Sequence, residues 1–112
     1  MEWIAGEFEI KGTEGTHTKA GHRTERWGVD ARILAGVLCW HVTHRATGFL
    51  VPRKFLTEQA AKAFCEDIDG LTDWATFAAG DAPTFPHKDA LWEAAVKRGG
   101  FRDCPWQPDE DY

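Results

Sequence analysis

The chain of 112 residues is long enough for one domain and too short for two ordinary ones. Hydrophobic residues make up 43% and charged residues 28%, a globular composition, and the net charge is -5. There is no Ser and no Asn, which excludes serine-hydrolase chemistry, phosphoserine switches, Asn-linked glycosylation and a Cys-His-Asn triad.

Targeting and membrane signals are missing from the sequence. No apolar run approaches the roughly 20 residues that span a bilayer, and residues 1–4 lack the basic start of a signal peptide. The cysteines Cys39, Cys65 and Cys104 are odd in number and form no CxxC pair. We therefore expect a cytoplasmic protein with free thiols and no membrane contact.

The first half of the chain is predicted to form strands, because apolar and polar residues alternate there. The strands are expected over residues 3–10, 27–34, 37–44 and 49–51. Pro52 is expected to end the last strand, and Gly48 suits a hairpin turn that needs a positive φ. Residues 11–24 hold no large apolar side chain, so we expect a long mobile loop there.

The second half is predicted to be helical. Thr57 suits the N-cap of a helix whose apolar residues recur at helical spacing up to Gly70. Residues 72–73 are expected to cap a short helical turn. A second amphipathic helix is expected to follow Pro86 and to end at residues 99–100.

Strands that precede helices predict an α+β fold. We expect an antiparallel meander of three to four strands followed by two main helices packed on one face of the sheet. A single domain is expected over residues 1–101, followed by an acidic, proline-containing tail over residues 102–112.

No catalytic or metal-binding motif is complete. Cys39 and His41 share one face of their predicted strand but have no known zinc spacing, and residues 12–15 lack the Gly-Lys-Thr ending of a P-loop. Cys65 lies on the apolar side of its helix, where thiols are buried and inert. We expect a protein that is not an enzyme, with no catalytic residue, no cofactor and no metal; a Cys- or metal-dependent enzyme is the third hypothesis.

Charge is divided unevenly along the chain. Residues 11–54 hold eight basic and three acidic residues, whereas residues 55–112 hold five basic and twelve acidic residues. Because the strands precede the helices, we expect a basic sheet and an acidic helical layer.

Two binding functions would use this charge division. The acidic helical face and the tail could dock on a protein; the contact residues would be Glu66, Asp67, Asp69, Asp73 and Trp106. The basic strands and loops could instead bind nucleic acid, with Trp27 and Phe49 close enough to stack on bases. The phosphate contacts would then be Arg23, Arg26, Arg45, Arg53 and Lys54.

Three segments together resemble a pattern in small accessory proteins of phages and mobile elements of high-GC bacteria. They are Trp40–Phe49, Leu56–Ala61 and Leu71–Trp74. The resemblance implies no catalytic residue; it implies a protein that binds a host protein, inhibitors of host defence systems included. The first hypothesis is therefore a non-catalytic accessory protein that modulates or inhibits a host protein in the host cytoplasm, and the alternative is nucleic-acid binding.

Overall fold

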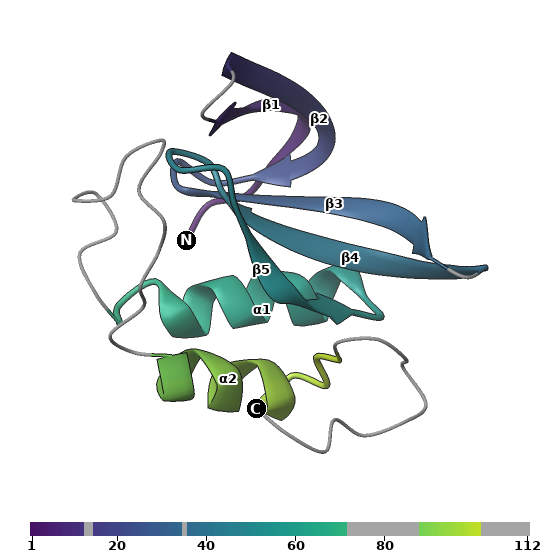
Figure 1. Cartoon of the computed structure of the whole chain (residues 1–112), viewed down its shortest axis with the longest axis vertical. Helices are drawn as coiled ribbons and strands as arrows, with labels where there is room; N and C mark the ends of the chain where they lie inside the picture. The colour runs from purple at the N-terminus through teal and green to yellow at the C-terminus, as the bar shows by residue number, and fades with distance from the viewer. Residues whose placement is uncertain (13–14, 35, 72–87, 102–112) are drawn as a thin grey trace.

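The computed structural model describes residues 1–12, 15–34, 36–71 and 88–101. Within them the chain forms a five-stranded antiparallel sheet of order β1-β2-β3-β4-β5 and two helices (Figure 1). The strands are β1 (Ile4–Gly12), β2 (Gly15–Arg23), β3 (Trp27–Leu34), β4 (Val37–His44) and β5 (Phe49–Phe55). The helices are α1 (Glu58–Ile68) and α2 (Lys88–Lys97). The predicted α+β class and antiparallel meander are confirmed, with more strands than expected.

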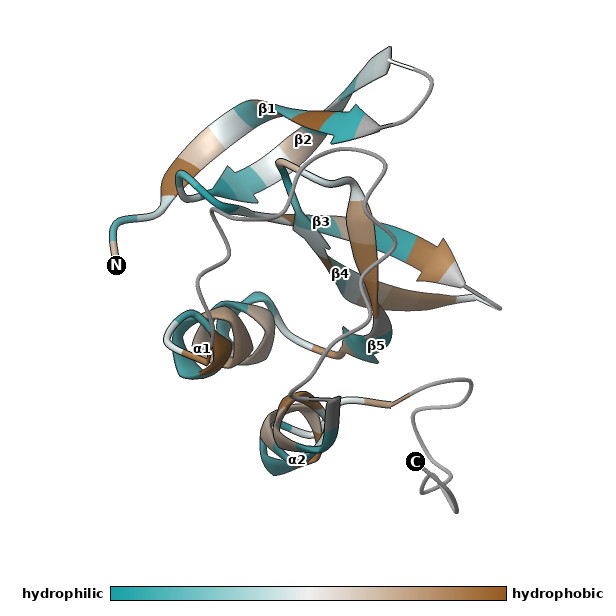
Figure 2. Cartoon of the chain, turned by 60° about the vertical axis from the view of Figure 1, so that its left-hand side comes forward, coloured by the Kyte–Doolittle hydropathy of each residue, from teal (hydrophilic) through white to brown (hydrophobic). Residues whose placement is uncertain are grey.

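The extra strand lies where a loop was predicted. The expected mobile loop over residues 11–24 is wrong, because β2 occupies residues 15–23 and pairs with β1 from Ile4 opposite Arg23 to Gly12 opposite Gly15. All residues of β2 are exposed or half-buried, and Figure 2 colours the strand teal or pale, without the strong brown of β1. Backbone hydrogen bonds hold this strand in place, so it forms without the apolar alternation that identifies buried strands.

The β1–β2 ribbon curls over one face of the sheet (Figure 1). It joins β3 through only two residue pairs, His22 with Val29 and Arg23 with Gly28. Its far end returns to the turn after β4, where the backbone N–H of Lys11 donates to the carbonyl oxygen of Arg45 at 2.8 Å. The curl therefore turns a flat meander into a partly closed, concave sheet.

The contact between Phe8 and Gly28 fixes this curl. The Phe8 ring is 2% exposed, and a Cβ atom added to Gly28 would lie 2.2 Å from its Cε2 atom. Only a residue without a side chain lets the ring lie directly on the backbone of β3.

The opposite face of the sheet forms the main core with α1. Helix α1 contacts β3, β4 and β5, and α2 contacts α1. The buried cluster joins strand residues to helix residues; it includes Trp27, Val29, Val42, Phe55, Phe64, Ile68, Leu91 and Ala95. The finer expectation, that both helices pack on one face of the sheet, stays a prediction.

Several local predictions are confirmed. The strands over residues 27–34 and 37–44 have the predicted bounds, and Gly48 has a φ of 76° in the hairpin turn. The Thr57 hydroxyl caps α1 by accepting a hydrogen bond from the Ala60 backbone N–H at 3.0 Å. The helical turn that residues 72–73 were expected to cap and the tail over 102–112 lie outside the described residues.

Strand β5 is longer than predicted, because Pro52 does not end it. Leu50 pairs with Thr43 and Lys54 with His41, so three residues of β5 stand opposite Val42 alone. Proline is tolerated at such a bulge, where no ladder hydrogen bond needs its missing N–H. Two extra residues leave the alternation of side chains unchanged, so Leu50 and Lys54 share one face and Arg53 lies on the other, over the Trp92 ring of α2.

In the described part of the chain, no helix is both long and apolar enough to cross a membrane.

We expect Gly28→Ala to lower the free energy of unfolding by about 1–3 kcal/mol, because the new methyl group would overlap the Phe8 ring. Urea denaturation followed by tryptophan fluorescence measures this loss. Gly70→Ala is the matched control, since nothing lies within 4 Å of a Cβ atom added there. In a Phe8→Ala background the cost of Gly28→Ala should shrink; an unchanged cost would show that the ring does not set this constraint.

Candidate functional site

Basic side chains gather on the concave face of the sheet. Residues in register share a face of a sheet and neighbours along a strand alternate between faces. The registers therefore place one set of ionisable side chains on the face away from α1: His17, Lys19 and Arg23 of β2, Asp30 and Arg32 of β3, His41 of β4 and Lys54 of β5. We call this surface the basic face.

One carboxylate lies among these described strand residues, and it is already engaged. Asp30, which is 4% exposed, accepts from Nε of Arg32 at 2.7 Å and from Nη2 at 3.3 Å. The acidic residues of β1, Glu7 and Glu9, fall on the other face by alternation with Phe8. The basic face thus carries an excess of positive charge.

A hollow of about 290 Å³ opens on the basic face. All five strands and the β4–β5 turn contribute to it: its lining consists of Ile10, His17, Lys19, Arg32, Thr43, Gly48 and Leu50. The lining holds two permanent cations and no carboxylate, beside two apolar side chains. We call it the basic hollow; its lining suits an anion.

His41 lies beneath the cations as a neutral group. Burial lowers its pKa to about 4, with the charges of Arg32, Lys54 and Lys19 lowering it as well and that of Asp30 raising it. These charges come from Lys19 of β2, Arg32 of β3 and Lys54 of β5, so cations of three strands lie near His41. Within the part of the chain that the structure describes, His41 Nε2 and Thr43 Oγ1 are buried without a hydrogen-bond partner.

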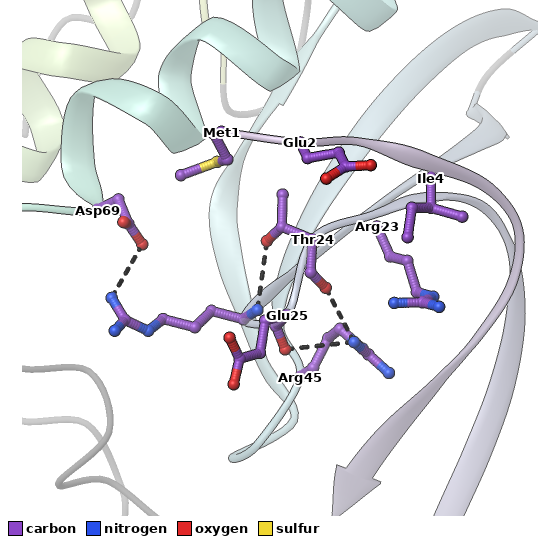
Figure 3. A pocket seen from close by; sticks show the side chains of 9 residues that line it. Met1, Glu2, Ile4, Arg23, Thr24, Glu25, Arg45 and Asp69 are labelled. Carbon is purple, nitrogen blue, oxygen red and sulfur yellow. Dashed lines mark hydrogen bonds and ion pairs between the residues drawn. The ribbon is translucent and has the colours of Figure 1, made fainter.

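Three of the predicted basic residues meet in a second pocket of about 520 Å³ (Figure 3). Arg23, Arg26 and Arg45 line it together with the carboxylates of Glu2, Glu25 and Asp69; Met1, Ile4 and Thr24 complete the lining. Figure 3 shows Arg23 and Arg45 on one side of this pocket and Asp69 on the other. The two signs of charge balance, so this pocket lacks the positive excess of the basic face.

Arg45 stabilises the fold through hydrogen bonds to the backbone. Its guanidinium donates to the carbonyl oxygens of Glu9 at 3.0 Å, Thr24 at 2.9 Å and Glu25 at 3.2 Å. These bonds tie the β4–β5 turn to β1 and to the segment between β2 and β3. Burial and the nearby charge of Arg23 lower the pKa of Arg45, which nevertheless stays protonated.

Arg23 and Arg26 differ in their availability. Arg26 Nη1 lies 3.3 Å from Oδ1 of Asp69. No carboxylate of the described residues pairs with Arg23, which lies at the junction between the pocket and the basic face. Arg23 is therefore the member of this group best placed to contact an external anion.

Two predicted nucleic-acid contacts are wrong, because the side chains are buried. Arg53 is 1% exposed, and its Cζ atom lies 3.1 Å from the ring centroid of Trp92. Trp27 is fully buried, and its Nε1 donates to Oδ1 of Asp69 at 2.9 Å, so it cannot stack on a base. Phe49 packs against the same core, whereas Lys54 does lie on the basic face.

The described carboxylates of the acidic helical face (Glu66, Asp67, Asp69 and Asp73) have partners within the chain. Glu66 accepts from Trp3 Nε1 at 3.2 Å, and Asp67 accepts from Arg98 at 2.7 and 3.0 Å. The bond with Arg98 lowers the pKa of Asp67. Asp69 accepts from Trp27 Nε1 and pairs with Arg26. The other two predicted contacts, Asp73 and Trp106, lie outside the described residues.

Metal ligands and thiols were the remaining candidates for chemistry. The residues that the structure describes contain no group of three or more His, Cys, Asp or Glu side chains that could hold a metal ion. Cys39 and Cys65 are free and buried, and burial raises the pKa of the Cys65 thiol well above its ordinary value. Such a thiol is a poor nucleophile at neutral pH.

Sequence reasoning assigned Arg23 of β2 to a site but missed Lys19 and His17 of the same strand and Arg32 of β3. Lys19 and Arg32 were counted only in the charge balance. The alternate spacing of His17, Lys19 and Arg23 is the signal that would have placed them on one face, had residues 15–23 been interpreted as a strand.

Comparison with protein-family models, with curated proteins and with solved structures gives no match. The site is therefore argued from its own geometry.

Protonation of His41 should destabilise the fold. The group binds its proton near pH 6.5 in the unfolded chain and only near pH 4 in the folded chain, so the unfolded state gains protons first as the pH falls. Between pH 7 and pH 5 this difference should remove about 2 kcal/mol of the free energy of unfolding. Burial followed by the charge of Arg26 also lowers the pKa of His44, which adds to the loss.

Urea denaturation at pH 7 and pH 5 tests this expectation. His41→Gln should lose markedly less stability over this interval than the wild type. His17→Gln is the matched control, because His17 is an exposed residue of the same face. Identical losses in the wild type and His41→Gln would rule out His41 as the titrating group.

Proposed function

We propose that the protein is a non-catalytic nucleic-acid-binding protein whose basic face contacts the phosphate backbone. The observation that supports this proposal is the gathering of Lys19, Arg23, Arg32 and Lys54 on one concave surface. The single described carboxylate there is paired with Arg32. Neutralising phosphates with Lys and Arg releases condensed counterions, which is the main source of sequence-independent affinity.

The spacing of the cations suits an extended anion. Lys19 and Arg23 lie four residues apart on β2, about 13 Å along the strand. Arg32 and Lys54 extend the charge across the sheet to β3 and β5. One strand of nucleic acid lying in the concavity could therefore contact several cations at once.

The mode of binding should be insensitive to base sequence. Phe8 and Phe101 are the described aromatic side chains that pairing places on or beside the basic face, and both are buried. Stacking platforms read or hold bases in many single-strand binders, and the described part of this face presents none. Phosphate contacts should therefore supply most of the affinity.

Protein binding through the acidic helical face is the less favoured proposal. A host partner would have to compete with Arg98 for Asp67, and with Trp27 and Arg26 for Asp69. Breaking the bond to Trp27 would also leave a buried indole N–H without its acceptor. On the basic face, Lys19 and Arg23 have no carboxylate partner among the described residues.

Fluorescence anisotropy with a labelled single-stranded DNA of mixed sequence tests nucleic-acid binding. We expect affinity to fall steeply as salt rises, and Arg23→Gln and Lys19→Gln each to weaken binding and to reduce the salt slope by about 1. Each change removes one cation that contacts phosphate.

Lys97→Gln is the matched control, because it removes one positive charge from an exposed position at the end of α2. It should leave affinity and salt slope close to the wild-type values. No binding at micromolar protein and low salt, or an equal effect of all three changes, would refute the proposal.

A further inference from the structure

The basic hollow lies where the concave face is closed. Ile10 and His17 come from the far end of the β1–β2 ribbon, and Gly48 comes from the β4–β5 turn. These two parts are joined by the bond from Lys11 to Arg45 and by the bond from Arg45 to Glu9. A strand of nucleic acid lying along the basic face would meet this junction as a barrier, so the hollow is placed to receive an end of the strand.

The donors in the hollow match a phosphate group. Asp30 engages Nε and Nη2 of Arg32, which leaves Nη1 to donate outward and fixes the plane of the guanidinium. Lys19 adds an ammonium group from the facing ribbon. Thr43 lines the hollow, and its buried hydroxyl has no partner among the described residues; a phosphate oxygen on the floor would supply one.

The charge of the hollow favours one form of phosphate over another. A phosphate monoester carries a charge of about -1.5 to -2 at neutral pH, whereas a diester within a strand carries a single negative charge. A lining with two permanent cations and no carboxylate stabilises the monoester more strongly. The volume of about 290 Å³ leaves room for such a group together with part of its sugar.

We infer that the basic hollow binds the terminal phosphate monoester of a nucleic-acid strand that lies along the basic face. This inference rests on the proposed function and adds a preference for one kind of strand end.

Three oligonucleotides of one sequence test the inference: one with a 5′-phosphate, one with a 3′-phosphate and one with neither. In competition anisotropy at fixed salt, we expect one phosphorylated form to bind about tenfold more tightly than the unphosphorylated form, a difference of about 1.4 kcal/mol. Inorganic phosphate should reduce this preference by competing for the hollow.

Variants separate the hollow from the rest of the basic face. Lys19→Gln should remove most of the preference, and Thr43→Val, which keeps the shape and deletes a buried hydroxyl, should reduce it without unfolding the chain. Arg23→Gln is the matched control: Arg23 lies on the basic face but outside the hollow, so all three oligonucleotides should weaken together and the ratio should hold.

The possible failures are distinguishable. Equal affinity for the three oligonucleotides would overturn the terminal-phosphate site and leave the proposed function standing. Binding of inorganic phosphate without binding of any oligonucleotide would overturn both. A preference that survives Lys19→Gln and Thr43→Val unchanged would overturn the assignment to this hollow.

Discussion

The contact of Phe8 with the backbone at Gly28 is the constraint on which the shape of the molecule depends. Two residue pairs join the β1–β2 ribbon to β3, so the sheet alone leaves the ribbon free to bend. The Phe8 ring packs on β3 at Gly28, so the ribbon bends over the face of the sheet away from α1. A side chain at position 28 would prevent this contact. The bend brings Lys19 of β2 close to His41, near Arg32 and Lys54, although these residues lie far apart in sequence.

The pairing of carboxylates decides which cations remain available. On the helical side, Glu58 binds His22 at 2.6 Å and Lys62 at 2.8 Å, and Asp67 binds Arg98. These contacts join α1 to β2 and to the end of α2, so the acidic charge of the helical layer mostly stabilises packing. Exposed pairs of this kind contribute up to about 1 kcal/mol each. Glu58 and Asp67 thus lie away from the basic face, and Asp30 is the carboxylate that the described strands place on it.

The sequence predicted elements whose side chains are buried and missed those held by the backbone. Alternation located β3 and β4 to the residue, because one side of each packs on α1. The same signal failed for β2, whose side chains are mostly exposed. Arg53 was assigned to a contact surface because Pro52 was expected to end the strand before it. The strand continues to Phe55, and alternation with Val51 and Phe55 places Arg53 on the buried face.

Buried polar groups beneath the basic hollow lower the free energy of unfolding of the protein without a ligand. Thr43 and its neighbour His41 each bury a polar atom without a partner in the described residues, at a cost of roughly 1–3 kcal/mol per group. Apolar side chains of similar size would avoid this cost. Local costs of this kind are typical of functional sites, where a ligand supplies the missing partners. A phosphate that accepts from Thr43 would remove part of the cost, so binding and folding would be coupled through the floor that the ribbon covers.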